Sequence, residues 1–165
     1  IEFLRQSGIT NGYSNNTYRP GQSISRGEFT LMVCRAFQFS TGGSSGFPDV
    51  PAGSSYAGAV AAARELGIVQ GNNGLFQPDR PITRQSAMTM ICRAIEAAGQ
   101  TLPAADTALL SSYADGSQVS VFARPSVAAL VQMGAVRGNS SSRLNPGAAI
   151  SRAEMAVILH RVLTR

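Results

Sequence analysis

A five-residue motif occurs three times in this chain and constrains its fold more than any other feature. The copies are Ile-Ser-Arg-Gly-Glu at 24–28, Ile-Thr-Arg-Gln-Ser at 82–86 and Ile-Ser-Arg-Ala-Glu at 150–154. Each copy follows a Gly/Pro-rich stretch and precedes a run with helical periodicity, so its Ser or Thr stands where a helix N-cap is expected. Glu28 and Glu154 complete a capping box with Ser25 and Ser151. The motif therefore predicts three equivalent helix starts.

An arginine occupies the first helical position of every copy: Arg26, Arg84 and Arg152. A cation at this position meets the positive end of the helix dipole, which opposes it by about 0.3 to 1 kcal/mol at an exposed site. Helix stability therefore does not explain the arginine. Free N–H groups at a helix N-terminus and a guanidinium fork suit a carboxylate or a phosphate, so we expect each arginine to belong to an anion-binding site.

Further residues recur at fixed distances from these arginines. A first glycine lies 17 or 18 residues upstream, a second glycine follows it by four residues, and a proline precedes the arginine by six. Such regular spacing marks a repeated supersecondary unit. The first glycines, which fit helix C-caps, are Gly8, Gly67 and Gly134. The second glycines are Gly12, Gly71 and Gly138.

Helical periodicity flanks each glycine-rich loop. The runs before the loops are clearest at 56–66 and 122–133, and those after the motif span 28–37, 86–98 and 154–163. Each unit is therefore a helix, a loop and a second helix. An apolar residue stands two positions before each loop proline, and we expect its side chain to pack into the core and anchor the loop; these residues are Tyr18, Phe76 and Leu144. Because a pair of helices cannot bury its apolar face alone, we expect the three units to pack together as one all-α domain.

We predict repeat boundaries at 1–40, 41–100 and 101–165, with the three repeats forming one compact domain. An aromatic-x-Asp element, which ends at Asp49 or Asp115, precedes the first helix of repeats two and three. Repeat one has no such element and starts inside its first helix, so we expect it to be N-terminally incomplete. The motif arginines are 58 and then 68 residues apart, and we expect the ten extra residues to form a surface loop.

The charge of the chain suggests an anionic partner. All 14 basic residues are arginine and the net charge is +5, although a preference for arginine can equally reflect codon bias. No apolar run approaches the ~20 residues of a membrane span, so membrane insertion is not expected. Two cysteines by their spacing form neither a disulfide framework nor a zinc ligand set.

Together, the aromatic-x-Asp, Gly-Ile-x-x-Gly, aromatic-x-Pro and Ile-Thr/Ser-Arg-x-Glu elements resemble the S-layer homology family, in three tandem copies over almost the whole chain. The resemblance implies a pseudo-threefold spindle of helix-loop-helix repeats around a central three-helix bundle, with grooves between neighbouring repeats. It also implies a secreted module of the bacterial cell wall or surface layer. Such modules attach surface-layer proteins and exported enzymes non-covalently, commonly by binding a secondary cell-wall polysaccharide that bears pyruvate ketals.

By this motif match, the three motif arginines would contact the ketal carboxylate. We expect the carbohydrate-binding sites to include the loop glycines Gly12, Gly71 and Gly138 and the aspartates Asp49 and Asp115. The simplest interpretation of the aspartates is as caps of the first helices, and acceptance of sugar hydroxyls is the alternative.

Some positions depart from the family pattern. Ser86 replaces the motif glutamate of repeat two, so its helix cap loses one partner and we expect Arg84 to be less well placed. The chain has no tryptophan, so stacking on a sugar would fall to Tyr13, Tyr56 or Phe122. With repeat one incomplete as well, we expect one or two working grooves rather than three.

Two more sets of residues occupy equivalent positions. Cys34, Cys92 and His160 lie eight residues after the motif arginines, and Arg35, Arg93 and Arg161 lie nine after them. We favour a helix-packing flank for the first set over a metal site, and predict neither a metal nor a cofactor. For the second set we favour an exposed helix face or an ion pair, such as Arg93 with Glu96, over ligand contact.

The leading hypothesis is a carbohydrate-binding anchor rather than an enzyme. The only histidine is His160, and we find no catalytic triad, carboxylate pair or phosphate loop. The expected partner is a pyruvylated secondary cell-wall polysaccharide or a peptidoglycan-linked glycan, and the expected cargo is a surface-layer protein or an exported enzyme. One alternative is a structural assembly module without ligand binding. Another is a nucleic-acid-binding protein, which the positive charge favours but the lack of interleaved aromatics does not.

Overall fold

The computed structural model describes residues 1–165. Its α-helices are α1 Glu2–Gln6, α2 Arg26–Ala36, α3 Ala57–Glu65, α4 Arg84–Ala97, α5 Arg124–Gln132 and α6 Arg152–Leu163. Short 3-10 helices are η1 Thr107–Ser112, η2 Gly116–Gln118 and η3 Val121–Ala123. The β-structure is limited to isolated bridges, so the predicted all-α class is confirmed. None of the helices combines the length and the apolar character needed to cross a membrane.

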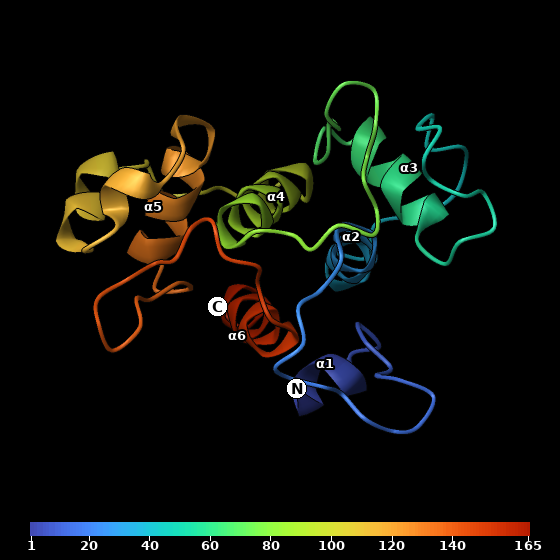
Figure 1. Cartoon of the computed structure of the whole chain (residues 1–165), viewed down its shortest axis with the longest axis horizontal. Coiled ribbons are helices and arrows are strands. Elements are labelled where there is room, and N and C mark those ends of the chain that lie inside the picture. The colour runs from blue at the N-terminus through green and yellow to red at the C-terminus, as the bar shows by residue number, and fades with distance from the viewer.

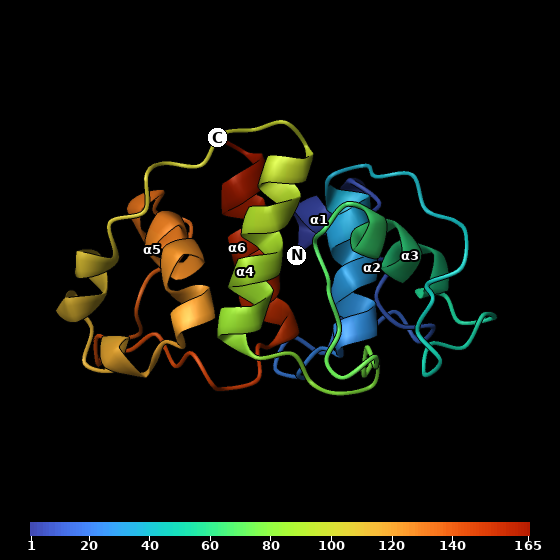
Figure 2. The same cartoon turned by 90° about the horizontal axis from the view of Figure 1, so that it is seen from above.

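The helices are arranged as a ring of three lobes. The second helices of the repeats, α2, α4 and α6, lie in the middle, and the first helices, α1, α3 and α5, lie around them (Figure 1). Viewed at right angles, the central helices run side by side (Figure 2). The outer helices pack across the repeat boundaries: α3 on α2, α5 on α4 and α1 on α6. Each lobe therefore joins one repeat to the next, and α1 closes the ring against α6.

The isoleucines that open the three motifs tie the repeats together. Ile24 donates its backbone N–H to the carbonyl of Ile150 (3.2 Å), Ile150 donates to Ile82 (3.0 Å), and Ile82 donates to Ile24 (3.1 Å). All three side chains are buried. This closed cycle satisfies backbone groups that would otherwise be orphaned in the interior.

The predicted N-caps are confirmed for all three central helices. The side chains of Ser25, Thr83 and Ser151 each accept the N–H of the residue three positions on. Glu154 completes a capping box by accepting the N–H of Ser151 at 2.8 Å. The capping box predicted for Glu28 does not form, since this side chain accepts no hydrogen bond from the N–H of Ser25.

The ten extra residues of the second connection were expected to form a surface loop, and this expectation is wrong in part. The segment contains η1, whose start is capped by Asp106 through the N–H of Ala108 (3.0 Å). Leu110 of η1 is 4% exposed and joins the core. The insertion is therefore anchored by an apolar side chain.

The predicted C-caps are confirmed at the first glycine of each loop. Gly8, Gly67 and Gly134 have φ values of +69°, +74° and +73°. In the second repeat the N–H of Ile68 donates to the carbonyl of Ala63 at 2.8 Å, which is the bond that ends a helix in a Schellman motif. The left-handed conformation turns the chain from the outer helix into the loop.

Replacement of Gly67 by alanine tests this role of the backbone. A Cβ at Gly67 would meet no atom within 4 Å, so any loss of stability comes from the backbone conformation. Left-handed alanine costs roughly 1–2 kcal/mol, which a stiffer unfolded chain offsets by roughly 0.4–1 kcal/mol. We expect Gly67→Ala to lower the free energy of unfolding by about 1 kcal/mol in urea titration. Gly53→Ala, at a glycine with equal space and no positive φ, is the control, and an equal loss there would contradict the assignment.

Candidate functional site

Each motif arginine fastens its own repeat to the loop of the following one. The acceptor is always the carbonyl of the residue two positions before the loop proline. Nε of Arg26 donates to Phe76 (3.0 Å), Nε of Arg84 to Leu144 (2.7 Å) and Nε of Arg152 to Tyr18 (2.9 Å). The bonds run from repeat one to two, from two to three and from three back to one. This contact, which we call the arginine latch, explains a cation at the first helical position without any ligand.

The N–H groups at the start of the central helices are used in the same junctions. In α2, Arg26 and Gly27 donate their N–H groups to the carbonyls of Arg80 and Pro78, both at 2.9 Å. The third N–H of the helix goes to Ser25. The same bonds recur at the starts of α4 and α6. The prediction that free helical N–H groups take part in anion binding is therefore wrong, because the loop of the next repeat already accepts them.

The motif glutamates also act across a repeat boundary. Oε1 of Glu154 lies 2.8 Å from Nη1 of Arg84, and Oε2 of Glu28 lies 3.6 Å from Nη1 of Arg152. In both pairs the glutamate belongs to the repeat that follows the arginine. Two of the three motif arginines thus already have an internal carboxylate beside them.

Ser86 occupies the equivalent position at the remaining junction, and Arg26 has no carboxylate partner there. We expected Ser86 to disturb Arg84, and this was wrong: Arg84 keeps Glu154, and the arginine that loses its partner is Arg26. Burial, followed by the field of Arg80, lowers the pKa of Arg26 below its ordinary value, while Asp49 acts in the opposite direction. The guanidinium is still charged at neutral pH.

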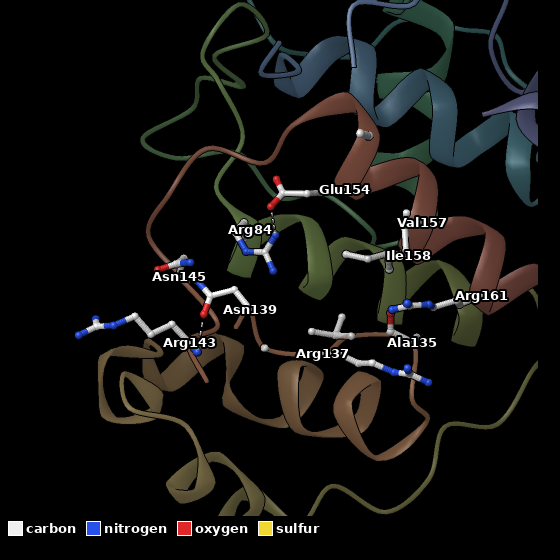
Figure 3. A pocket seen from close by; sticks show the side chains of 13 residues that line it. Arg84, Ala135, Arg137, Asn139, Arg143, Asn145, Glu154, Val157, Ile158 and Arg161 are labelled. Atoms are coloured by element: carbon white, nitrogen blue, oxygen red, sulfur yellow. Dashed lines mark hydrogen bonds and ion pairs between the residues drawn. The ribbon is translucent and has the colours of Figure 1, made fainter. Parts of the chain in front are cut away.

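The Arg84 groove is a cavity of about 300 Å³ between Arg84, the loop of repeat three and α6 (Figure 3). Its lining includes Gly138 and a single carboxylate, Glu154. Four arginines line it: Arg84, Arg137, Arg143 and Arg161. The guanidinium of Arg84 faces Glu154 within the groove (Figure 3).

Arg137 and Arg143 were not singled out from the sequence. Both are exposed on the loop of repeat three, where repeat two carries Gln70 and Leu75 at the equivalent positions. A comparison of the three loops for charges present in one copy alone would have found them. They make this rim more cationic than that of the other loops.

The Arg26 groove is a cavity of about 230 Å³ that receives residues from all three repeats. Its lining includes Arg26 from α2, Gly71 from the loop of repeat two, Ser86 and Arg93 from α4, and Phe122 from η3. No carboxylate lines it. Thr89, Arg93 and Phe122 also line an adjoining cavity of about 580 Å³, so the groove continues beyond Arg26.

The Arg152 junction is closed by contrast. Arg152 is 4% exposed, and its guanidinium carbon lies 4.9 Å and 4.8 Å from the ring centroids of Tyr13 and Tyr18. Its Nη2 lies 3.5 Å from the hydroxyl oxygen of Thr10. The cavity of about 200 Å³ beside this loop is lined by Gly12 and residues of α1, and not by Arg152.

Of the three aromatics predicted for sugar stacking, Phe122 lines a groove and is 57% exposed. Tyr13 is covered by Arg19, whose guanidinium carbon lies 4.4 Å from the ring centroid. Tyr56 packs over Gly27, where an added Cβ would lie 2.9 Å from its ring. This contact explains a glycine in the first turn of α2 despite its poor helix propensity.

The second set of arginines contributes to the groove walls. Arg93 donates through Nη1 to the carbonyl of Ile68 (3.2 Å), and Arg161 donates to that of Ala135 (3.3 Å). The ion pair predicted between Arg93 and Glu96 does not form. Arg35 is exposed, as expected for a helix face.

Cys34, Cys92 and His160 lie at helix-packing flanks, as we favoured. The thiols of Cys34 and Cys92 each lie 3.5 Å from a carbonyl of the next outer helix, at Ala59 and Ser126. Burial raises the pKa of the Cys34 thiol to about 11 and that of Cys92 to about 12. His160 makes an edge contact with Phe3, with ring centroids 4.9 Å apart. The three residues thus face three different outer helices, and no group of side chains suited to hold a metal occurs.

Comparison with known proteins agrees with this architecture. The family model described as the S-layer homology domain matches residues 1–30, 46–88 and 112–156. Each matched segment falls in one of the three repeats. The chain belongs to the S-layer homology family.

Similar proteins contain these S-layer homology repeats within much longer chains. An amylopullulanase of Thermoanaerobacterium thermosulfurigenes is 31% identical over 166 residues, which cover 100% of this chain and 9% of that protein. A surface-layer 125 kDa protein of Lysinibacillus sphaericus is 30% identical, with 99% of this chain and 14% of that protein covered. A cellulosome-anchoring protein of Acetivibrio thermocellus is 26% identical, with coverages of 93% and 35%. The chain thus spans only a fraction of each relative.

In the second and third S-layer homology repeats, the aspartate of the aromatic-x-Asp element holds the loop. Asp49 accepts the N–H groups of Phe76 and Gln77 at 2.9 and 2.6 Å, and Asp115 accepts two equivalent N–H groups at 2.8 Å each. The interpretation of these residues as helix caps is wrong, since neither α3 nor α5 has a side-chain cap. Asp115 is 1% exposed, so its geometry supports positioning of the loop rather than contact with a sugar.

The loop contacts determine the titration of Asp115. Burial alone would raise its pKa, but the hydrogen bonds from the N–H groups of Leu144 and Asn145 outweigh burial, and the net pKa lies below the usual value. A depressed folded-state pKa means that this carboxylate stabilises the fold above the unfolded pKa of about 3.9. That stabilisation is lost as the pH falls through the lower, folded value.

We expect Asp115→Asn to lower the free energy of unfolding by about 3 kcal/mol at neutral pH. The carboxylate accepts two charge-assisted hydrogen bonds, and the single amide oxygen that replaces it cannot accept both N–H groups. The difference from the unmodified chain should shrink as the pH falls below the unfolded pKa of about 3.9. Urea titrations at neutral pH and at a series of lower pH values measure it. Asp106→Asn, at an exposed cap with one bond, is the control and should cost less than about 1 kcal/mol. A difference that did not depend on pH would contradict the charge-based explanation.

Proposed function

We propose that this chain anchors a protein to the bacterial cell wall by binding an anionic secondary cell-wall polysaccharide, one that carries pyruvate ketals, in the grooves between its repeats. The observation that carries the proposal is the pair of cationic grooves at the Arg26 and Arg84 junctions, each lined by a motif arginine and a second glycine. Membership of the S-layer homology family supports a location outside the cell. Among the relatives, one is named a surface-layer protein and another a cellulosome-anchoring protein, which supports an anchoring role.

The chemistry of the grooves fits a sugar acid. A ketal carboxylate is a planar anion fixed to a pyranose ring, and a guanidinium can bind it through two parallel N–H donors. The arginine latch uses Nε, so a ligand would be bound through the terminal nitrogens, one of which already contacts Glu154 in Arg84. Binding at more than one groove would add avidity along a polymer. No bond is made or broken in this function, and the cargo would be a surface-layer protein or an exported enzyme that contains the module.

A purely structural module is the second candidate, and a specific observation favours it. The arginine latch gives every motif arginine a structural task that requires no ligand. The structural candidate does not explain why Arg26 lines a groove without a carboxylate.

Sedimentation with purified cell walls separates the two candidates. We expect the chain to bind walls that carry pyruvylated polysaccharide, and to bind at least about 10-fold more weakly after mild acid has removed the ketals, because the charged acceptor is then absent. Equal binding to both preparations would contradict recognition of the ketal. Absence of binding to either would favour the structural module. A gel shift with DNA at several salt concentrations tests the nucleic-acid alternative.

A further inference from the structure

We infer that the Arg26 groove is the principal site for the sugar carboxylate, and that Ser86 determines this by leaving Arg26 unpaired. The inference rests on the proposed function and specifies which junction performs it. The three junctions share one backbone geometry but differ in what surrounds the guanidinium.

The first argument concerns the free donors of each motif arginine. All three use Nε in the arginine latch, so a carboxylate can be bound end-on only through Nη1 and Nη2 together. In Arg26, whose guanidinium carbon lies 5.0 Å from the ring centroid of Phe76, neither terminal nitrogen has a hydrogen-bond or ion-pair partner. In Arg84, Nη1 is held by Glu154. In Arg152, Nη1 faces Glu28 and Nη2 faces Thr10.

The second argument concerns competition. A sugar carboxylate that enters the Arg84 groove must displace Glu154 or lie beside it, and a like charge at that distance opposes binding. Glu154 is also held in place by the N–H of Ser151, so it is pre-organised to compete. The Arg26 groove presents Arg26 and Arg93 with no carboxylate in its lining.

The third argument concerns the rest of the ligand. Phe122 is a large apolar side chain left 57% exposed at the Arg26 groove, and an aromatic face of this kind suits the C–H groups of a sugar ring. The adjoining cavity shares Thr89, Arg93 and Phe122 with the groove, so further sugar units of a polymer have room beside the first. The Arg84 groove has no aromatic residue in its lining.

Substitution of Ser86 gives the sharpest test. Ser86→Glu restores the residue found at the other two junctions, where the glutamate lies 2.8 and 3.6 Å from its arginine. It also restores a capping box with Thr83, so the variant should unfold at a higher temperature while its groove is blocked. Ser86→Gln can form the same cap without charge and is the matched control.

The probe is a methyl hexoside that carries a pyruvate ketal, titrated by calorimetry and by amide chemical shifts. We expect Ser86→Glu to bind the probe about 10-fold or more weakly than Ser86→Gln, because the two side chains have the same size and only the glutamate carries a competing charge. Shifts in the unmodified chain should be largest at Gly71 and Arg93 rather than at Gly138. Phe122→Ala, which removes the stacking surface, should weaken binding several-fold.

Glu154→Gln tests the same mechanism in the other direction. Glutamine keeps the capping box of α6 and removes the charge beside Arg84, so we expect binding at the Arg84 groove to strengthen several-fold, with new shifts at Gly138.

The possible outcomes separate the inference from the proposed function. If the chain binds pyruvylated walls and the probe but Ser86→Glu binds as tightly as Ser86→Gln, the inference is wrong and the proposed function stands. Shifts centred on Gly138 in the unmodified chain would have the same meaning. If the unmodified chain binds neither, the proposed function fails and the inference fails with it.

Discussion

The arginine latch is the contact on which the rest of this structure depends. A single Nε–H of each motif arginine reaches the loop of the following repeat, and two helical N–H groups beside it reach the same loop. These bonds satisfy the start of each central helix, so the loop and the helix of different repeats form one unit. The grooves lie at these junctions because the latch brings the loop and the helix together there.

The latch also explains how one residue can serve the fold and a ligand. Nε is committed to the loop in every repeat, whereas the contacts of the two terminal nitrogens differ from one repeat to the next. The Nε–H bond of the latch is therefore the same in all three repeats. The third residue of the next central helix determines which group lies beside the terminal nitrogens of the arginine. A glutamate at this position pairs with the guanidinium, and a serine leaves the guanidinium without a carboxylate partner. Pseudo-symmetry of the backbone and asymmetry of the sites are thus compatible.

Local features of the fold could be predicted from the sequence, because their causes lie within a few residues. The N-caps at Ser25, Thr83 and Ser151 and the C-cap glycines follow from spacing alone. Periodicity does not show whether a loop docks on its own repeat or on the next one. For this reason Ser86 was assigned to the wrong arginine, and the helical N–H groups were thought to be free. The role of Asp49 and Asp115 was missed for a related reason: their partners lie 27 to 30 residues further along the chain.

The three junctions also differ in how the chain connects them. A connecting segment links α2 to α3 and α4 to α5, so the lobes they form are held together covalently as well as by packing. The lobe of α6 and α1 has no such link, and ring closure there depends on contacts alone. Arg152 is the most enclosed of the three motif arginines, with its guanidinium between two tyrosines and beside Glu28, and cation–π contacts of this kind contribute roughly 0.5–2 kcal/mol each. In an arginine used in this way to close the ring, all three guanidinium nitrogens contact protein groups. Arg26 lies at a covalently linked junction and can be left without a carboxylate partner, because the segment between α2 and α3 already holds its lobe together.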